Sequence, residues 1–284
     1  MKRLLSYLCA PFRPSRTRGV SLLGKHRARP QLESLEARQL LSANWWYNTS
    51  HTLWTSFDDS QAYSVRSDGS VSGGTLQYDT YLWINTAHSL YAEFAAETPV
   101  TFNPDGSVSA GSLRNDTDLY IDTAHAMQYV FAAYTRATFN PDGSVSAGTL
   151  QNDEYLWYNT AHTMYASFAA NTPTTFNSDG SVSAGTLTYD WNLWIDTAHS
   201  TYDEFAGGTG VAFRPDGSVS EGTLLSNTKL YSDAAHTVWN TYAAGTVVDF
   251  RPDGSASAGT LLSNVTDPFA NTTDPNAFPN GTAA

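Results

Sequence analysis

The chain has 284 residues, of which 41% are hydrophobic. Residues 1–43 carry nine Lys and Arg against two Glu, a net charge of +7, whereas the rest carries six basic against twenty-five acidic residues, a net charge of −19. A body this acidic repels phosphate backbones, so nucleic acid is excluded as an expected partner. Cys9 is the single cysteine, so the body can hold no disulfide and no cysteine metal site. No uninterrupted apolar run reaches about 18 residues, so no transmembrane segment is expected.

Residues 1–43 have the features of an export leader. They begin with Met1-Lys2-Arg3 and a short apolar stretch, which weakly matches a secretory signal. Residues 31–43, Gln-Leu-Glu-Ser-Leu-Glu-Ala-Arg-Gln-Leu-Leu-Ser-Ala, resemble the LEPR-xLL segment at the N-terminus of secreted and surface proteins of planctomycete-type bacteria, with Ala37 at the family's proline. The resemblance implies export, with processing or anchoring near Ser42 and Ala43. The alternative is an amphipathic helix over residues 32–41.

The body is built from six copies of one unit, whose clearest example is Asn140 to Leu150, Asn-Pro-Asp-Gly-Ser-Val-Ser-Ala-Gly-Thr-Leu. Its Asp-Gly pair recurs every 37 residues without insertion or deletion, and the copies are numbered here 1 to 6 by these pairs. They are Asp68 and Gly69, Asp105 and Gly106, Asp142 and Gly143, Asp179 and Gly180, Asp216 and Gly217, and Asp253 and Gly254. A period of this length indicates a repeat architecture in which each unit packs on its neighbours.

Each copy ends in a predicted hairpin. In copy 2 the apolar residues alternate with Thr or Ser on both sides of the turn, which favours two strands with one buried face. Proline suits the first central position of a type I turn, and the glycine suits the left-handed position that lets the second strand begin with a bulge. A second glycine, before Thr-Leu or Ser-Leu, suggests a bulge or a close approach of neighbouring backbones. It recurs at Gly74, Gly111, Gly148, Gly185, Gly222 and Gly259.

The segment before this hairpin fits two structures. Its apolar residues have helical spacing at Ala87, Leu90, Tyr91, Phe94 and Ala95. A candidate helix N-cap precedes it in every copy, at Asn48, Asn85, Asp122, Asn159, Asp196 and Asp233. The segment is nevertheless short and rich in Thr, Tyr, Trp and Phe, and Asn/Asp-Thr-Ala-His also suits a hairpin turn, so a strand is favoured and a helix stays open.

A second resemblance bears on the fold. Phe94 to Phe102, Asp105-Gly106 and Gly111 to Leu113 are similar to bacterial hairpin repeats of the pattern F-x-x-G-T-x-V-x-F…G-x-V-x-x-G-T-L, which are themselves similar to MORN repeats. Such arrays extend one long sheet and serve as scaffolds and surfaces. The resemblance implies an all-β fold, a tandem array of six 37-residue β-hairpin repeats in an elongated, solenoid-like sheet. The alternatives are a six-bladed β-propeller and a β-hairpin plus a short helix in each copy.

Six of the seven histidines follow the period, at His51, His88, His125, His162, His199 and His236. Strand spacing would place equivalent histidines about 9–19 Å apart, whereas two nitrogens on one zinc lie within about 3.5 Å of each other. The histidines of different copies therefore cannot share an ion, and we interpret them as turn residues that bond to backbone, with metal binding as a less favoured alternative. No cofactor is expected.

Two aromatic rows also follow the period. One contains Trp46, Trp83, Tyr120, Trp157, Trp194 and Tyr231, and the other contains Trp54, Tyr91, Tyr165, Tyr202 and Trp239, interrupted by Gln128. We interpret them as core, because Trp and Tyr bury large areas and the repeat has few large aliphatics. The alternative is a ligand surface that stacks on sugar rings, with Trp83, Trp157, Trp194, His88, His162 and His199 as its candidate residues.

No motif of a known catalytic site is present. Around Asp105 the acidic first and twelfth positions of a calcium loop are Thr101 and Ser112, which excludes an EF-hand. The chain has no G-x-S-x-G, no H-E-x-x-H and no phosphate loop, and six near-identical units lack a differentiated site, so we expect no enzyme.

The sequence thus predicts three parts: an export leader that is disordered or removed (1–43), a repeat domain (44–264) and a disordered Asn/Thr/Pro-rich tail (265–284). The predicted function is that of a non-catalytic structural or interaction protein, secreted or at the bacterial cell surface. The alternative is a carbohydrate-binding protein that uses the aromatic rows. The partner is unknown, with a cell-envelope protein or a glycan as the candidates.

Overall fold

The computed structural model describes residues 44–262, so the expectations for the leader and the tail lie outside the described residues. This part of the chain is all-β: it holds 24 strands and no helix, and no segment of it is a helix long and apolar enough to cross a membrane. The all-β array of hairpin repeats is confirmed, and the alternative with a short helix in each copy is wrong.

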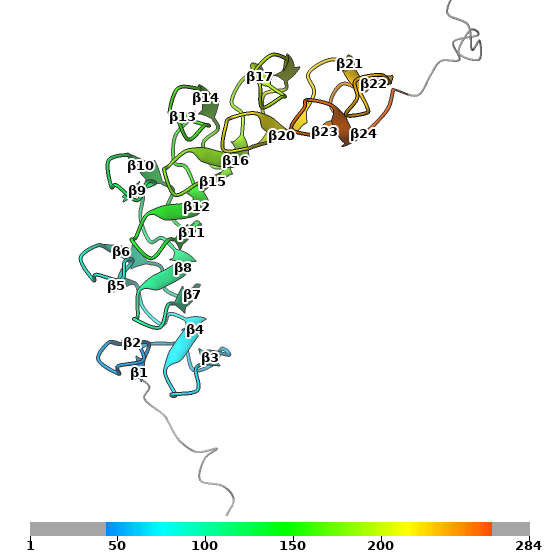
Figure 1. The fold of residues 1–284 in the computed structure, drawn as a ribbon. Helices are drawn as coiled ribbons and strands as arrows, with labels where there is room; N and C mark the ends of the chain where they lie inside the picture. The colour runs from blue at the N-terminus through cyan, green and yellow to red at the C-terminus, as the bar shows by residue number, and fades with distance from the viewer. Residues whose placement is uncertain (1–43, 263–284) are drawn as a thin grey trace, which may run out of the picture. The chain divides into compact units, whose positions relative to one another are not determined.

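Each copy contributes two hairpins, and the second of them enters a common sheet (Figure 1). These sheet hairpins are β3 (Ser64–Val65) with β4 (Val71–Thr75), β7 (Pro99–Phe102) with β8 (Val108–Ser112), β11 (Arg136–Phe139) with β12 (Val145–Thr149), β15 (Pro173–Phe176) with β16 (Val182–Thr186), β19 (Gly210–Phe213) with β20 (Val219–Thr223), and β23 (Val247–Phe250) with β24 (Ala256–Gly259).

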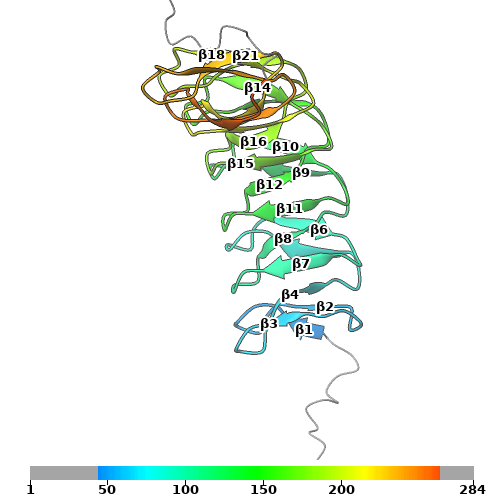
Figure 2. The same cartoon turned by 90° about the vertical axis from the view of Figure 1, so that its right-hand side faces the viewer.

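The sheet hairpins form one antiparallel sheet of 12 strands in chain order, from β3 at one edge to β24 at the other. Figure 2 shows β4, β7, β8, β11 and β12 following one another in this order. A six-bladed propeller would instead give each copy its own four-stranded sheet. Because one continuous sheet crosses all copies, the propeller alternative is wrong.

The first hairpin of each copy, called here the side hairpin, stands apart as a two-stranded sheet (Figure 1). The side hairpins are β1 (Asn44–Trp46) with β2 (Trp54–Ser56), β5 (Thr80–Trp83) with β6 (Tyr91–Phe94), β9 (Thr117–Tyr120) with β10 (Gln128–Phe131), β13 (Glu154–Trp157) with β14 (Tyr165–Phe168), β17 (Trp191–Trp194) with β18 (Tyr202–Phe205), and β21 (Thr228–Tyr231) with β22 (Trp239–Tyr242). The segment of each copy for which helix and strand were both open, residues 86–96 in copy 2, is thus a loop followed by a strand.

The Asn-Pro-Asp-Gly turn has the predicted geometry. In copy 2 the Asn103 N–H donates to Ser107 O at 2.8 Å, Gly106 has φ 96°, and the register shifts by one residue between Thr101 and Phe102, which is a bulge. The Asp105 carboxylate accepts from the Ser107 N–H at 3.1 Å and from its hydroxyl at 2.9 Å. These bonds close the turn and satisfy its backbone groups.

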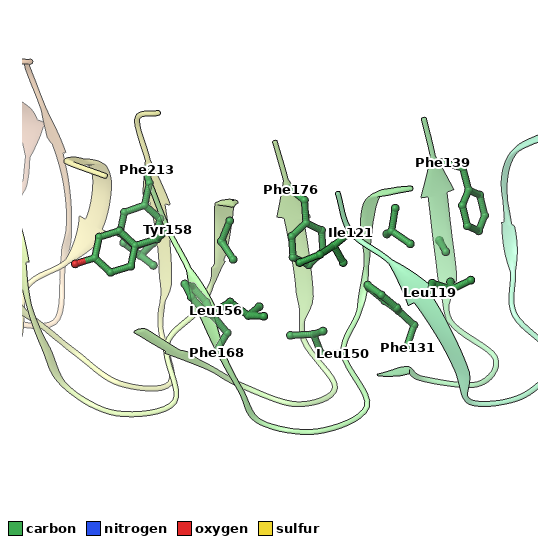
Figure 3. Packing of buried hydrophobic residues seen from close by; sticks show 14 of the residues in the cluster. Leu119, Ile121, Phe131, Phe139, Leu150, Leu156, Tyr158, Phe168, Phe176 and Phe213 are labelled. Carbon is green, nitrogen blue, oxygen red and sulfur yellow. The ribbon is translucent and has the colours of Figure 1, made fainter. Parts of the chain in front are cut away.

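The core lies between the sheet and the side hairpins (Figure 3). Each of copies 1 to 5 buries one phenylalanine completely, at Phe57, Phe94, Phe131, Phe168 and Phe205, next to a leucine from the end of its sheet hairpin. Phe131 also contacts Phe176 of the next copy edge to face, at 6.1 Å between ring centroids. Burial of these side chains therefore stabilises each copy and couples it to its neighbour.

The second glycine of each copy has a different role from the one predicted. A Cβ on Gly148 would lie 2.6 Å from Cδ1 of Phe131, and a Cβ on Gly111 would lie 2.7 Å from Cδ1 of Phe94. The glycine is therefore needed because an aromatic ring rests on it, and a close approach of two backbones is not the reason.

Candidate functional site

The side hairpins present their aromatic residues to solvent. Along β5 the side chains alternate, so that Leu82 is buried while Tyr81 on one side of it is 65% exposed and Trp83 on the other is half-buried. Trp83 lies directly opposite Tyr91 of β6, which is 61% exposed. Each side hairpin therefore has one face toward the core and one aromatic face toward water.

The residues at the positions of Trp83 and Tyr91 are called here the aromatic pair of a copy. In copies 2, 4 and 5 the two rings meet edge to face, at centroid distances of 6.0 Å for Trp83 and Tyr91, 5.6 Å for Trp157 and Tyr165, and 5.7 Å for Trp194 and Tyr202. Copy 6 differs, because Tyr231 and Trp239 stack at 3.5 Å. Copy 3 has Tyr120 opposite Gln128 and so lacks the second ring.

These positions correct the interpretation of the aromatic rows as core. The members of the second row are exposed: Trp54, Tyr91, Tyr165, Tyr202 and Trp239. Trp46 is 42% exposed, and Trp83, Trp157 and Trp194 are half-buried at the hairpin surface. The physical reason is the alternation of the strand, which turns the smaller Leu82 inward and leaves the larger Trp83 outside.

Sequence reasoning missed a third aromatic residue of this face. Tyr81 in copy 2 and Tyr155 in copy 4 precede their tryptophans by two residues, and each contacts the tyrosine of its pair edge to face. A shallow depression of about 250 Å³ lies at Tyr81, Leu82, Trp83 and Tyr91. The period of two along a strand was the signal that could have found these tyrosines.

The periodic histidines are turn residues, as predicted. In copy 2 the His88 N–H donates to Asn85 O at 3.0 Å, and His88 has φ 50°, in the left-handed region. The ring of His88 stacks on Trp83 at 5.9 Å, and His162 stacks on Trp157 at 6.3 Å. His199 lies tilted against Trp194 at 5.9 Å. All six candidate ligand residues therefore belong to the aromatic faces of side hairpins.

In copies 3, 4 and 6 the histidine also approaches the Asp-Gly turn of its own copy, which sequence reasoning did not anticipate. Nε2 of His162 lies 3.8 Å from Oδ2 of Asp179, and Nε2 of His125 lies 3.9 Å from Oδ2 of Asp142. A depression of about 390 Å³ is lined by this first pair together with Asp122, Thr123, Ala124, Ala126 and Met127 of the preceding copy. Within residues 44–262 no three His, Asp, Glu or Cys side chains come together as a metal site.

Polar residues around the aromatic pairs are acidic or neutral in copies 2 to 5. Glu93 lies opposite Tyr81 and accepts a hydrogen bond from Asn115 of the next copy at 2.6 Å. The negative charge of Glu93 raises the pKa of the Tyr81 phenol. Asp118 and Glu204 occupy outward positions of the same kind, and none of these face positions holds Lys or Arg. The face thus combines apolar rings with hydrogen-bond acceptors.

Comparison with known proteins finds no family model that matches this chain and no match among curated proteins.

Proposed function

We propose that this chain is a non-catalytic structural and interaction protein, secreted or at the bacterial cell surface, whose side hairpins form the binding face. The observation that supports this most is the exposure of the aromatic pairs. The core is already supplied by the buried Phe and Leu of each copy, so folding does not require Trp83, Trp157 or Trp194 at these positions. Exposed aromatic clusters of this kind are typical of binding surfaces.

A carbohydrate ligand is the second candidate, and one observation favours it. The tyrosines of the pairs in copies 2, 4 and 5 are exposed and their tryptophans are half-buried, with Glu93 and Glu204 on the same face in copies 2 and 5. Sugars combine flat apolar faces with hydroxyl donors. The export implied by the LEPR-xLL resemblance of residues 31–43 would bring the face into contact with envelope glycans.

The proposal is tested with immobilised glycans and peptides probed with the whole chain. Saturable binding that is lost in Trp157→Ala, while the circular dichroism spectrum and melting temperature stay those of the wild type, is the expected result. Tyr78→Ser is the matched control, because Tyr78 is 62% exposed but lies in the connection from β4 to β5. The proposal fails if no saturable binding occurs, or if binding is equal in wild type, Trp157→Ala and Tyr78→Ser.

A further inference from the structure

The side hairpins recur once in each copy, so the binding face has a repeat as well as a chemistry. Each copy adds two strands to the sheet, and two strand spacings within the sheet amount to about 9.4–9.8 Å. The side hairpins are separate two-stranded sheets, tied to this sheet by bridges such as Phe94 to Leu113 and Phe131 to Leu150. A ligand that meets successive pairs must therefore present a similar surface at a regular interval set by the copies.

Resting on the proposed interaction function, we propose that the side-hairpin face binds a linear, neutral polysaccharide lengthwise, with sugar rings stacked on the aromatic pairs of successive copies. A disaccharide in an extended chain has a length close to the two strand spacings that one copy adds to the sheet. Each copy that carries an aromatic pair can add a further contact to the same chain, so the affinity should grow with the number of such copies engaged.

Charge decides which polymers can occupy this face. The chain after residue 43 has a net charge of −19, Glu93 and Glu204 lie beside the aromatic pairs of copies 2 and 5, and Asp118 lies on the same face of copy 3. Nucleic acids, sulfated glycans and uronic acid polymers would all be repelled. A neutral polysaccharide is not, and its hydroxyl groups can donate to these carboxylates.

Hydrogen-bond polarity also favours a sugar over a proline-rich peptide, the other regular ligand of aromatic grooves. A polyproline helix has a turn of about 9.3 Å, so spacing alone does not distinguish the two. Its prolines have no N–H, so that it offers mainly carbonyl acceptors. The acceptor-rich face around Glu93 and Glu204 complements a ligand with many donors, which is a polysaccharide.

The copies are not equal on this face, and the differences supply the test. Copies 4 and 5 are consecutive copies with open edge-to-face pairs, and Tyr165 of the first also contacts Trp191 of the second at 6.4 Å. Copy 2 has a third open pair. Copy 3 lies between copy 2 and copy 4 and has Gln128 at the position of the second ring of a pair. Gln128→Tyr should therefore give copy 3 an aromatic pair, so that the pairs run without interruption from copy 2 to copy 5.

The experiment measures affinity by titration calorimetry for neutral β-1,4-linked oligomers of glucose, N-acetylglucosamine and mannose, from a disaccharide to long oligomers. At least one series should bind more tightly as the oligomer lengthens. Gln128→Tyr should raise the affinity for the longest oligomer about two- to tenfold, the effect of one added stacked ring, and leave the disaccharide unchanged. Trp157→Ala should lose most of the affinity, and Tyr78→Ser should keep it.

The proposal is overturned if none of the three series binds, if affinity is independent of length, or if Gln128→Tyr leaves long-oligomer affinity unchanged. Binding of a proline-rich peptide that is lost in Trp157→Ala would also overturn the polysaccharide proposal, but the proposed interaction function would still hold. If the Trp157→Ala variant binds every immobilised glycan and peptide as the wild type does, the proposed function itself has failed.

Discussion

At the scale of single residues, the contact between a glycine and a buried aromatic ring determines what each copy tolerates. Gly148 lies under Phe131, and Gly222 lies under Phe205, where a Cβ would come within 2.6 Å of the ring. Such distances cannot be accommodated without moving a side chain that is fully buried. The ring and the glycine must therefore be considered together, as one packing unit.

Substitution of this glycine is expected to destabilise the array. Gly148→Ala should lower the free energy of unfolding by about 1–3 kcal/mol, because the added methyl group overpacks the site of Phe131. Gly210→Ala serves as the control, since a Cβ there meets nothing within 4 Å, and its effect should be close to zero. Urea denaturation of both variants measures the difference, and equal stabilities would contradict the packing argument.

The carboxylates of the Asp-Gly turns make stability depend on acid pH. Hydrogen bonds from Ser70 lower the pKa of Asp68, and those from Ser255 lower the pKa of Asp253. Because the folded pKa lies below the unfolded value of about 3.9, this stabilisation is present above that pH and is lost as the pH falls through the folded pKa.

Urea denaturation between pH about 5 and about 2 should therefore show a falling free energy of unfolding. Replacing Asp253 by Asn should remove the part of this slope that comes from Asp253, whereas Ser255→Ala should only reduce it, because the backbone N–H of residue 255 still donates to the carboxylate. A slope that is unchanged in Asp253→Asn would show that the turn carboxylate does not cause it.

At the scale of the element, the loop of each side hairpin is held by an Asn or Asp, which is buried in copies 1 to 5. In copy 4 Oδ1 of Asn159 accepts from the Thr163 N–H at 3.0 Å and from the Met164 N–H at 2.9 Å, and its amide donates to the Thr163 hydroxyl at 2.9 Å. Asp122 and Asp196 make the same two backbone bonds in copies 3 and 5. One acceptor thus closes the loop whether it is an amide or a carboxylate.

Removal of this acceptor should open the loop. Asn159→Ala leaves two backbone N–H groups without their partner and should cost about 1–3 kcal/mol of stability. Asn159→Asp should retain most of the wild-type stability, since copies 3 and 5 already carry Asp here. Thermal melting of both variants tests this, and an equal loss in the two would show that the acceptor is not what matters.

The same element shows how far sequence reasoning reached. The interpretation of Asn85 as a helix N-cap is wrong, whereas the hairpin turn that Asn85-Thr-Ala-His also suits is confirmed, and the composition of Tyr91 to Phe94 correctly favours a strand. The helical spacing of Leu90 and Phe94 was misleading, because a loop residue and a strand residue can both reach the core. Local spacing cannot separate these cases when the segment is this short.

The candidate site was harder to predict than the turns. The Asn-Pro-Asp-Gly turn is specified by local backbone preferences, which a sequence displays directly. The exposure of Trp83 depends instead on whether other residues fill the core, and Phe94 and Leu113 do so from parts of the copy that are distant in sequence. The size and apolarity of Trp83 therefore suggest burial. Its outward position follows instead from the alternation of side chains along the strand, in which the neighbouring Leu82 points inward.

At the scale of the whole repeat domain, equivalent contacts join neighbouring copies. The Thr86 N–H donates to Pro141 O of the next copy at 2.9 Å, and the Thr160 N–H donates to Pro215 O at the same distance. Stability is then expected to be a sum over copies and interfaces. Deleting copy 6 should leave a folded array with a lower melting temperature, measured by circular dichroism, and complete unfolding of the shortened chain would contradict this additivity.

The open edge at β24 has a consequence for how such a chain can change over time. Leu261 is 51% exposed, whereas its counterparts at 76, 113, 150, 187 and 224 are completely buried by the copy that follows each of them. An in-frame duplication of any internal 37-residue segment would insert a unit whose two neighbours already carry the matching contacts. Recombination within the gene can thus lengthen or shorten the array without redesign of the remaining copies, and the number of aromatic pairs would change with it.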